Sequence, residues 1–324
     1  MASPNSTFTE LVSTTFRKHR SQIKDNISNH NALYRYLVDG GRYRTEDGGL
    51  TIVTPLEYAT NGTYQRYSGY DTLNVQQSDV ITAAEFPWMQ IAMNVVASGR
   101  ELRINSGGPR IINLAKARLK NAMKTFANNF SFDIYADGTL PNQIGGLQAL
   151  VADAGTGTVG GIDSSTWTFW QNVVQSAAAP IQGGSAVTVS STTIENDIML
   201  PLWMELTRGD DKPNIIVASN DYFRFYEASQ VSLKRYASAE SAKGGFMSLK
   251  YKNADVIFDG GSGIPSAHMY FLNTDYIELV VHRDADLSVQ DELKPTNQDA
   301  AIIPILWMGN MVVSNRSLQG VAKA

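Results

Sequence analysis

The first forty residues carry a thin stripe of apolar side chains at helical spacing. The stripe consists of Phe8, Leu11, Val12, Phe16, Ile23, Ile27, Leu33 and Leu37. Thr7 and Glu10 have the spacing of a capping box, and Gly40 and Gly41 end the pattern. Because the stripe is narrow and its flanks are polar, residues 1–49 predict a helical arm that packs on another molecule. An ordinary first helix of the chain's own core is the alternative.

The next segment, residues 50–85, is rich in Thr, Tyr, Val and Asn, which favour strands and turns. Asn61 and Gly62 form a pair typical of a hairpin turn between two β-prone runs. The pattern predicts a long two-stranded ribbon. Since an isolated ribbon is only marginally stable in water, we expect it to rest on a neighbouring molecule.

A long amphipathic helix is predicted over residues 109–130. Pro109 suits the first helical position after two glycines. One face carries Ile112, Ala115, Leu119, Ala122, Phe126 and Phe130, whereas Lys116, Lys120 and Lys124 lie elsewhere. The spacing is consistent over about five helical turns.

After residue 138 the pattern alternates between short strands, glycine-containing loops and helices. Helices are predicted at 164–178, 192–206 and 221–236, the second with a Thr192/Glu195 capping box and a kink at Pro201. Strands are predicted at 213–219, 249–260 and 269–282, and residues 301–315 as a final extended pair. The elements lack the regular alternation of a doubly wound sheet, so the predicted class is α+β.

Composition removes several classes of function. The 324 residues contain no cysteine, which excludes disulfides, zinc–thiolate sites and cysteine nucleophiles. The formal net charge is -4 and no segment concentrates Lys and Arg, so sequence-specific nucleic-acid binding is not expected. No signal peptide or membrane-length apolar run is found, and we expect a protein that is made in a cytoplasm and binds no membrane.

One glycine motif could indicate a nucleotide site. Gly155, Gly157 and Gly160 match G-x-G-x-x-G. The dinucleotide fingerprint also needs an acidic residue about 20 positions later, yet none occurs between Asp163 and Glu195. A surface loop is the better interpretation.

Other candidate chemistry is sparse. The histidines are His19, His30, His268 and His282, and none has metal-ligand spacing. The close carboxylate pairs, Asp210 with Asp211 and Asp284 with Asp286, each have an arginine nearby and favour solvated loops or salt bridges. We therefore expect no catalytic, cofactor-binding or metal-binding residues, no cofactor and no enzyme activity.

The order of elements resembles the Hong Kong 97 fold of tailed-phage major capsid proteins. The likeness is carried by the helix at 109–130, the segments PNQIGGLQALV, STWTFWQN, PNIIVASNDYFRFYE, NADVIFDGG and MYFLNTDYIELVVH, and the terminal GNMVVSNRSLQGV. It covers nearly the whole chain but contains no invariant motif. The resemblance implies an N-terminal arm at 1–49, an extended loop at 50–85, a peripheral domain at 86–139 and 276–324 with a spine helix, and an axial domain at 140–275.

The resemblance also implies a function. It predicts a structural subunit that assembles with its own copies into hexamers and pentamers of an icosahedral head around phage double-stranded DNA, in the host cytoplasm. A portal and a separate scaffolding protein are expected partners, with no sequence-specific DNA contact. Some relatives join subunits through a lysine of the extended loop, but no lysine lies between Lys24 and Lys116, so a non-covalent shell is predicted.

Three alternatives stay open. An encapsulin, the shell protein of a cellular nanocompartment, has a similar fold and would enclose a cargo enzyme instead of a genome. A nucleotide-binding enzyme would use the glycine loop at 155–161. A tail or baseplate component would form tubes or rings.

Overall fold

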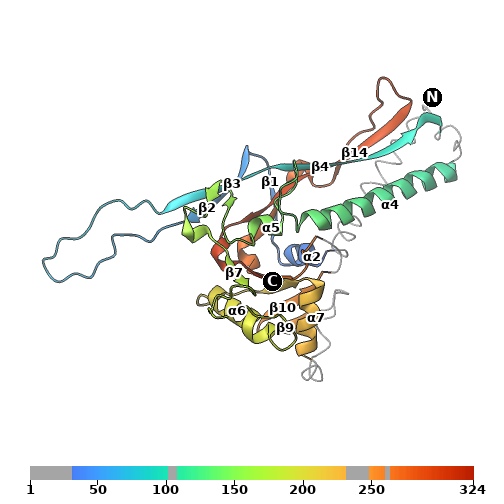
Figure 1. Cartoon of the computed structure of the whole chain (residues 1–324). Helices are drawn as coiled ribbons and strands as arrows, with labels where there is room; N and C mark the ends of the chain where they lie inside the picture. Colours follow the sequence, from blue (N-terminus) through green and yellow to red (C-terminus); the bar gives the residue numbers. More distant parts are fainter. Residues whose placement is uncertain (1–30, 101–107, 231–247, 260–262) are drawn as a thin grey trace.

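The computed structural model of the chain describes residues 31–100, 108–230, 248–259 and 263–324. Figure 1 shows an elongated molecule with a two-stranded ribbon at one end. At the other end lie helix α4 (Gly108–Asp133) and strands β4 (Met89–Ser98) and β14 (Ala300–Val313). The ribbon and α4 therefore extend from opposite sides of a central body.

A five-stranded sheet forms around β14. Its other members are β1 (Tyr43–Glu46), β4, β12 (Ile277–His282) and β13 (Ser288–Val289). Strand β14 pairs antiparallel with β4 from Ala300 to Gly309 and with β12 from Gly309 to Val313. The first ten positions of β14 alternate between half-buried and buried, as expected for a strand with one face on a core. The remaining residues, which pair with β12, are all buried.

A six-stranded sheet forms the second layer of the body. Its order is β7 (Val173–Ser176), β15 (Gly320–Lys323), β11 (His268–Leu272), β8 (Ile215–Ala218), β10 (Ala254–Phe258) and β9 (Ser248–Tyr251). Helices α6 (Leu200–Leu206) and α7 (Asn220–Ser229) share a second apolar core with this sheet. The last strand of the segment 276–324, β15, therefore belongs to the six-stranded sheet and not to the five-stranded one. The predicted α+β class is confirmed.

Shorter elements connect these layers. They are α5 (Leu147–Leu150), the hairpin β5 (Thr158–Val159) and β6 (Ile162–Asp163), and the 3-10 turns at Thr168–Trp170, Thr274–Tyr276, Arg283–Ala285 and Arg316–Leu318.

The last part of the predicted arm packs on its own chain. Helix α2 (Ala32–Asp39) begins at Asn31, whose side chain accepts a hydrogen bond from Tyr34 N, and ends at Gly40 as predicted. Leu33 and Leu37 are fully buried, and the ring of Tyr34 meets Phe130 of α4 edge-on at 5.6 Å. The expectation that this arm packs on another molecule is therefore wrong for residues 32–39. The capping box and stripe before residue 31 lie outside the described residues.

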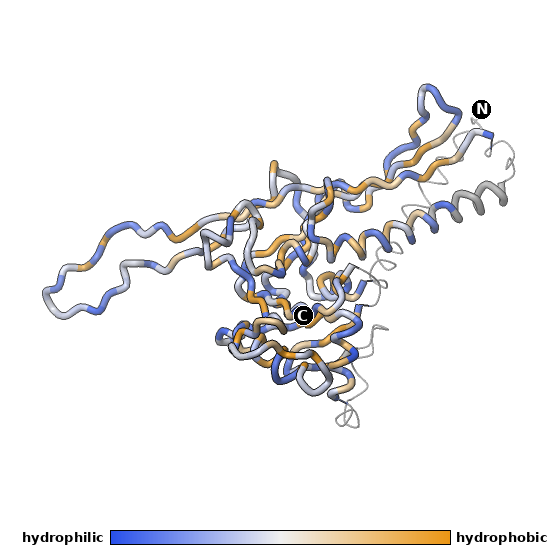
Figure 2. Tube along the Cα trace, viewed as in Figure 1, coloured by the Kyte–Doolittle hydropathy of each residue, from blue (hydrophilic) through white to orange (hydrophobic). Residues whose placement is uncertain are grey.

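The predicted helix at 109–130 is confirmed and is slightly longer. Phe126 and Phe130 of the predicted stripe are buried, and their rings stack with centroids 5.4 Å apart. The Phe130 ring also meets Trp307 edge-on at 5.1 Å. Figure 2 shows hydrophilic and hydrophobic positions interspersed along the coloured turns of α4. The C-terminal half of α4 thus fixes the helix to the five-stranded sheet.

The predicted helix at 164–178 is wrong. That segment contains only a 3-10 turn and strand β7, which pairs in parallel with β15. The carboxylate of Asp163 accepts hydrogen bonds from Ser165 N at 2.9 Å and Ser165 Oγ at 2.6 Å. Such side-chain bonds to the local backbone stabilise a turn where a helix would have to begin.

The predicted C-terminal pair at 301–315 is also wrong, because β14 runs through it as one strand of 14 residues. Gly309 does not mark a turn. A Cβ there would lie 2.5 Å from Val280 O, so glycine permits the close approach of β12.

The helix at 192–206 is confirmed, although its predicted N-terminus is not. A π-helical segment, Ile194–Met199, precedes Pro201 and α6, and its N-cap makes no side-chain hydrogen bond. Glu195 instead accepts a hydrogen bond from Gln230 Nε2 at 3.1 Å. The π-segment is the irregularity that accompanies the proline. Helix α7 confirms the start of the predicted 221–236 helix, whose end lies outside the described residues.

A buried arginine holds the C-terminal segment to the loops after α5. Arg316 is fully buried, and its guanidinium donates to Leu150 O at 2.8 Å, Trp170 O at 3.0 Å and Asn172 Oδ1 at 2.8 Å. Burial lowers the pKa of Arg316 to about 10. All of these acceptors are neutral, so the charge is satisfied by hydrogen bonds alone.

Candidate assembly interface

The ribbon consists of β2 (Thr51–Glu57), β3 (Ile81–Pro87) and the connecting residues 58–80. Strands β2 and β3 pair antiparallel from Thr51 with Pro87 to Glu57 with Ile81. Ile52, Leu56 and Phe86 point to the core and are buried. The alternation of buried and exposed positions in β2 therefore fixes the base of the ribbon to the body.

Beyond this base the ribbon loses its strand ladder. Tyr58 N still donates to Val80 O at 3.0 Å, but no strand follows within residues 58–80. Further out, the Gln65 side chain spans the gap, donating to Thr72 O at 3.1 Å and accepting from Asn74 N at 3.2 Å. We call residues 58–80 the free limbs, since Figure 1 shows them projecting away from the body.

The predicted hairpin turn at Asn61-Gly62 is wrong. Asn61 Oδ1 accepts from Thr63 N at 2.9 Å, which makes a local side-chain turn within one limb. The chain reverses at Ser68 and Asp71, where Asp71 N donates to Ser68 O at 3.0 Å. Gly69, with a φ of 45°, supplies the left-handed conformation of that turn.

The free limbs expose large side chains that the described part of the chain does not cover. None of residues 57–83 is buried. Tyr64 is 82% exposed, Tyr70 106% and Val75 90%, and Tyr67 and Leu73 are more than half exposed. Burying such a side chain contributes about 1.5–3 kcal/mol, so this surface favours association.

An acidic, aromatic pocket lies where the ribbon meets the β5–β6 hairpin. It has a volume of about 410 Å³. Its acidic and aromatic lining residues are Tyr58, Asp79, Asp163, Trp167 and Phe169. We call this the root pocket. The ring of Tyr58 lies 5.8 Å from that of Trp167 and 6.0 Å from that of Phe169.

Local hydrogen bonds favour the charged form of one carboxylate of the root pocket, that of Asp163. Hydrogen bonds from the Ser165 hydroxyl and N–H lower the pKa of Asp163. The pKa of the Tyr58 hydroxyl is raised, mainly by burial. The negative charge of Asp79 and a hydrogen bond to it raise this pKa further. Within the described residues neither carboxylate has a cationic partner. The pocket therefore suits a cationic group.

The glycine motif at 155–160 supports the ribbon. Gly160 O accepts from Glu85 N at 2.9 Å, and a Cβ on Gly160 would lie 2.7 Å from the Ala84 side chain. No helix follows the motif, so it lacks the helix N-terminus that a dinucleotide loop needs. The nucleotide interpretation loses its structural basis.

The candidate carboxylate pairs do not converge. The Asp211 carboxylate accepts a hydrogen bond from the Tyr276 hydroxyl at 3.1 Å, a contact that does not involve Asp210. Asp286 is buried and accepts from the Tyr43 hydroxyl at 2.7 Å, whereas Asp284 N donates to His282 Nδ1 at 3.2 Å. In the described part of the chain no three His, Cys, Asp or Glu side chains gather as metal ligands.

The two described histidines, His268 and His282, have different neighbours. His268 Nε2 contacts Asp153 Oδ2 at 3.0 Å, a pair that sequence spacing gave no means to predict. The ring of His282 meets Trp88 edge-on at 5.7 Å. His19 and His30 lie outside the described residues.

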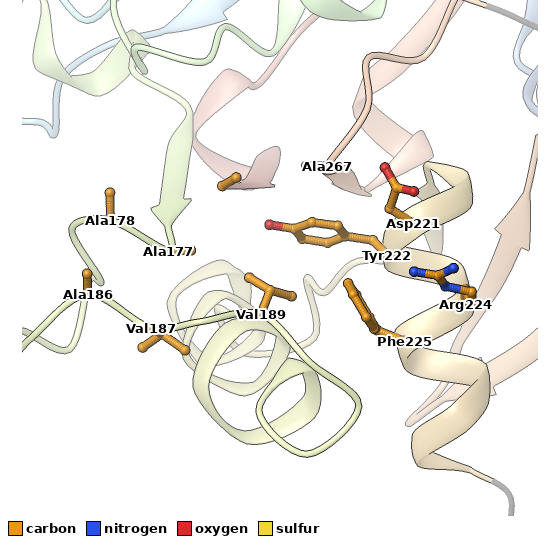
Figure 3. Close-up of a pocket in the computed structure, with 11 residues that line it drawn as sticks. Ala177, Ala178, Ala186, Val187, Val189, Asp221, Tyr222, Arg224, Phe225 and Ala267 are labelled. Atoms are coloured by element: carbon orange, nitrogen blue, oxygen red, sulfur yellow. The ribbon is translucent and has the colours of Figure 1, made fainter.

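A second hollow, of about 490 Å³, lies between α7 and the segment 177–189. Figure 3 shows Tyr222 and Phe225 facing small alanine and valine side chains across it. The Arg224 guanidinium lies over the Phe225 ring, 5.4 Å from its centroid. The hollow is mostly apolar and offers no converging acid and base.

Among the described helices, none combines the length and apolar character required to cross a bilayer.

No protein-family model and no curated protein matches the sequence. Solved structures do. The cyanophage A-1(L) capsid asymmetric unit is similar with a TM-score of 0.60 and 15% identity, over 87% of this chain and 90% of that one. The capsid of Myoviridae phage XM1 gives 0.53 and 11%, over 89% and 91%.

An encapsulin is similar too. The SrpI encapsulin of Synechococcus elongatus gives a TM-score of 0.51 and 9% identity, over 89% of this chain and 86% of that one. The predicted resemblance to tailed-phage capsid proteins is confirmed in the fold, which encapsulins share. This chain therefore has the fold of capsid and encapsulin shell subunits along nearly its whole length.

Proposed function

We propose that this protein is a major capsid protein, whose copies assemble into hexamers and pentamers of an icosahedral phage head around double-stranded DNA. One observation carries the proposal: the free limbs expose Tyr64, Tyr67 and Tyr70, which the rest of the described chain does not cover, on a fold shared with shell subunits. Repetition of one interface around closed rings stabilises a shell without further sequence.

The finer assignments follow from the same proposal. Residues 50–85 are the extended loop, 86–139 and 276–324 the peripheral domain with α4 as spine helix, and 140–275 the axial domain. The N-terminal arm is 1–49, of which α2 packs on its own subunit. The subunit acts by assembly and not by catalysis, it is part of the virion, and assembly in the host cytoplasm uses a separate scaffolding protein and a portal.

An encapsulin-type shell is the second candidate, and the likeness to the SrpI encapsulin favours it. The contents of the particle distinguish the two. Purified particles from the native source that contain nuclease-protected DNA support the capsid, whereas particles that contain one enclosed enzyme and no DNA support the encapsulin.

Electron microscopy of the purified protein, alone and with a scaffolding protein from the same source, tests assembly itself. Closed icosahedral particles are expected, and boiled samples should contain only the single chain because the shell is non-covalent. Tubes or open rings would support a tail component. A monomer under all conditions, with tight nucleotide binding in equilibrium dialysis, would contradict the proposal and support the enzyme.

A further inference from the structure

The hollow between α7 and the segment 177–189 contains a buried hydroxyl group without a hydrogen-bond partner. We call this space the α7 hollow. Tyr222, which lines it, is 1% exposed, and among the described residues nothing pairs with its hydroxyl. Tyr226 lies one helical turn further along α7, and its hydroxyl donates to Lys250 O at 2.8 Å. The missing partner is thus a property of the space that Tyr222 faces and not of the helix.

The direction of the Tyr222 ring identifies that space. Figure 3 shows the ring extending from α7 toward the segment of Ala177, with the hydroxyl at its leading end. Burial raises the pKa of Tyr222 to about 12, so the hydroxyl keeps its proton at neutral pH and can donate a hydrogen bond. A buried donor without an acceptor costs free energy, which an acceptor brought by a ligand would recover.

Small side chains leave the α7 hollow open. Its volume is about 490 Å³, which lies within the range of small-molecule sites. Hydrogen bonds hold the wall opposite α7 in place: Val187 N donates to Ala177 O at 2.7 Å, and Thr193 Oγ1 donates to Thr188 O at 2.8 Å. The hollow is therefore preformed. Its small apolar lining residues are Ala177, Ala178, Ala186, Val187, Val189 and Ala267.

The lining favours an uncharged, flat and mostly apolar occupant. The charged side chains that line the hollow, Asp221 and Arg224, have opposite signs and are both exposed. The Arg224 guanidinium lies over the outer part of the site, 5.4 Å from the centroid of the Phe225 ring. Phe225 offers an aromatic wall on which another ring can pack. The polar requirement of the site is one acceptor for the Tyr222 hydroxyl.

We propose that the α7 hollow is a binding site for a small, uncharged aromatic molecule that bears a carbonyl group. The aromatic ring lies between Phe225 and the wall of alanine and valine side chains, and the carbonyl oxygen accepts a hydrogen bond from the Tyr222 hydroxyl. The occupant is a free small molecule and not a side chain of a second protein. The site goes beyond the proposed function, because assembly of the subunits does not require it.

Two probes of nearly the same shape test the site. Acetophenone carries a carbonyl oxygen, and α-methylstyrene has a methylene group in its place. Titration of the full chain as dissociated subunits, followed by ligand-observed NMR, gives a Kd for each probe. Acetophenone should bind saturably with a Kd of about 1 mM or below.

Three variants separate the hydrogen bond from the shape of the hollow. Tyr222→Phe should weaken acetophenone binding by about three- to tenfold and leave that of α-methylstyrene within about twofold, because the ring remains and only the hydrogen bond is lost. Tyr226→Phe is the matched control and should change neither, since its hydroxyl bonds to Lys250 O. Ala186→Phe should weaken both probes by about tenfold or more, because Ala186 is exposed and the larger side chain fills the hollow without displacing the core.

The inference is overturned if acetophenone shows no saturable binding, if Tyr222→Phe weakens both probes equally, or if Ala186→Phe binds both as the unaltered chain does. Equal binding to subunits and to assembled particles would support it. Loss of binding on assembly would overturn it, by assigning the hollow to a side chain of a neighbouring subunit. A chain that assembles without binding either probe leaves the proposed function standing, whereas a chain that binds acetophenone and never assembles does the reverse.

Discussion

Helix α2 and the free limbs of the ribbon place their apolar side chains in opposite environments. In eight residues α2 buries Ala32, Leu33, Tyr34 and Leu37. The free limbs, residues 58–80, contain Tyr, Leu and Val side chains and bury none of them. The first segment completes the core of its own subunit, whereas the second leaves its apolar surface exposed.

The difference comes from what lies beside each segment. Leu33 and Leu37 recur at i and i+4, so both point into the core cluster that also contains Phe130 and Trp307. The free limbs project beyond the sheet, and the hydrogen bonds between them come largely from side chains such as Gln65. Stability of the subunit and stability of the assembly should therefore respond to different substitutions.

Removing the free limbs should give the largest effect. Replacing residues 60–78 by a short glycine-containing turn should abolish particles while leaving the free energy of unfolding of the subunit within about 0.5 kcal/mol, because no buried contact is lost. Electron microscopy and urea unfolding measure the two quantities. A shortened subunit that still forms closed particles would break the comparison.

Truncating α2 should have the reverse effect. Leu37→Ala should lower the free energy of unfolding by about 2–5 kcal/mol, because it leaves a cavity in the core. Leu73→Ala, on the exposed limb, is the matched control and should change it by less than about 0.5 kcal/mol. Equal effects in urea unfolding of the dissociated subunit would show that α2 does not belong to the core.

A buried and an exposed arginine should also differ in their effect on subunit stability. Arg316→Met should lower the free energy of unfolding by about 2–4 kcal/mol, since the buried Leu150 O and Trp170 O lose this donor and Asn172 Oδ1 keeps only that of Ala152 N. Arg66→Met, on the exposed limb, should have almost no effect. Thermal unfolding of both variants measures this, and an equally stable Arg316→Met subunit would contradict it.

Alkaline pH should give a smaller, graded effect on the body. Burial raises the pKa of Tyr222 and that of Tyr251 from 10.0 to about 12. A raised folded-state pKa contributes stability that is present below pH 10 and lost as pH rises toward 12. Urea unfolding at increasing pH measures it. Tyr222→Phe should reduce this loss of stability with pH at little cost near neutral pH, because the Tyr222 hydroxyl has no hydrogen-bond partner among the described residues. An unchanged pH dependence would be inconsistent with this account.

Elements with a long, regular pattern could be predicted from the sequence. The helix at 109–130 and the strands of the ribbon base have periods of 3.6 and 2 that leave little ambiguity. The segment 164–178 was predicted as a helix, but Ser165 N donates to the Asp163 side chain and forms a turn where that helix would begin. The extended pair predicted at 301–315 was wrong because the strand continues through Gly309, whose close approach to Val280 of another strand no local pattern contains.

The root pocket could not be predicted from the sequence. Tyr58 and Trp167 are far apart in the chain and meet only because Gly160 lets the β5–β6 hairpin pack against β3. The exposed tyrosines of the limbs were evident as composition, but their exposure depends on how far the ribbon projects. Sequence patterns thus identified the segment that leaves the body, and the fold identified the surfaces it offers.

The central claim is that the free limbs are covered by neighbouring subunits. Hydroxyl-radical footprinting with mass spectrometry, on dissociated subunits and on assembled particles, measures the exposure of Tyr64, Tyr67 and Tyr70 directly. The account predicts strong labelling of these tyrosines in the subunit and strong protection in the particle, with buried Tyr34 weakly labelled in both. Equal labelling of the three limb tyrosines in both states would contradict it.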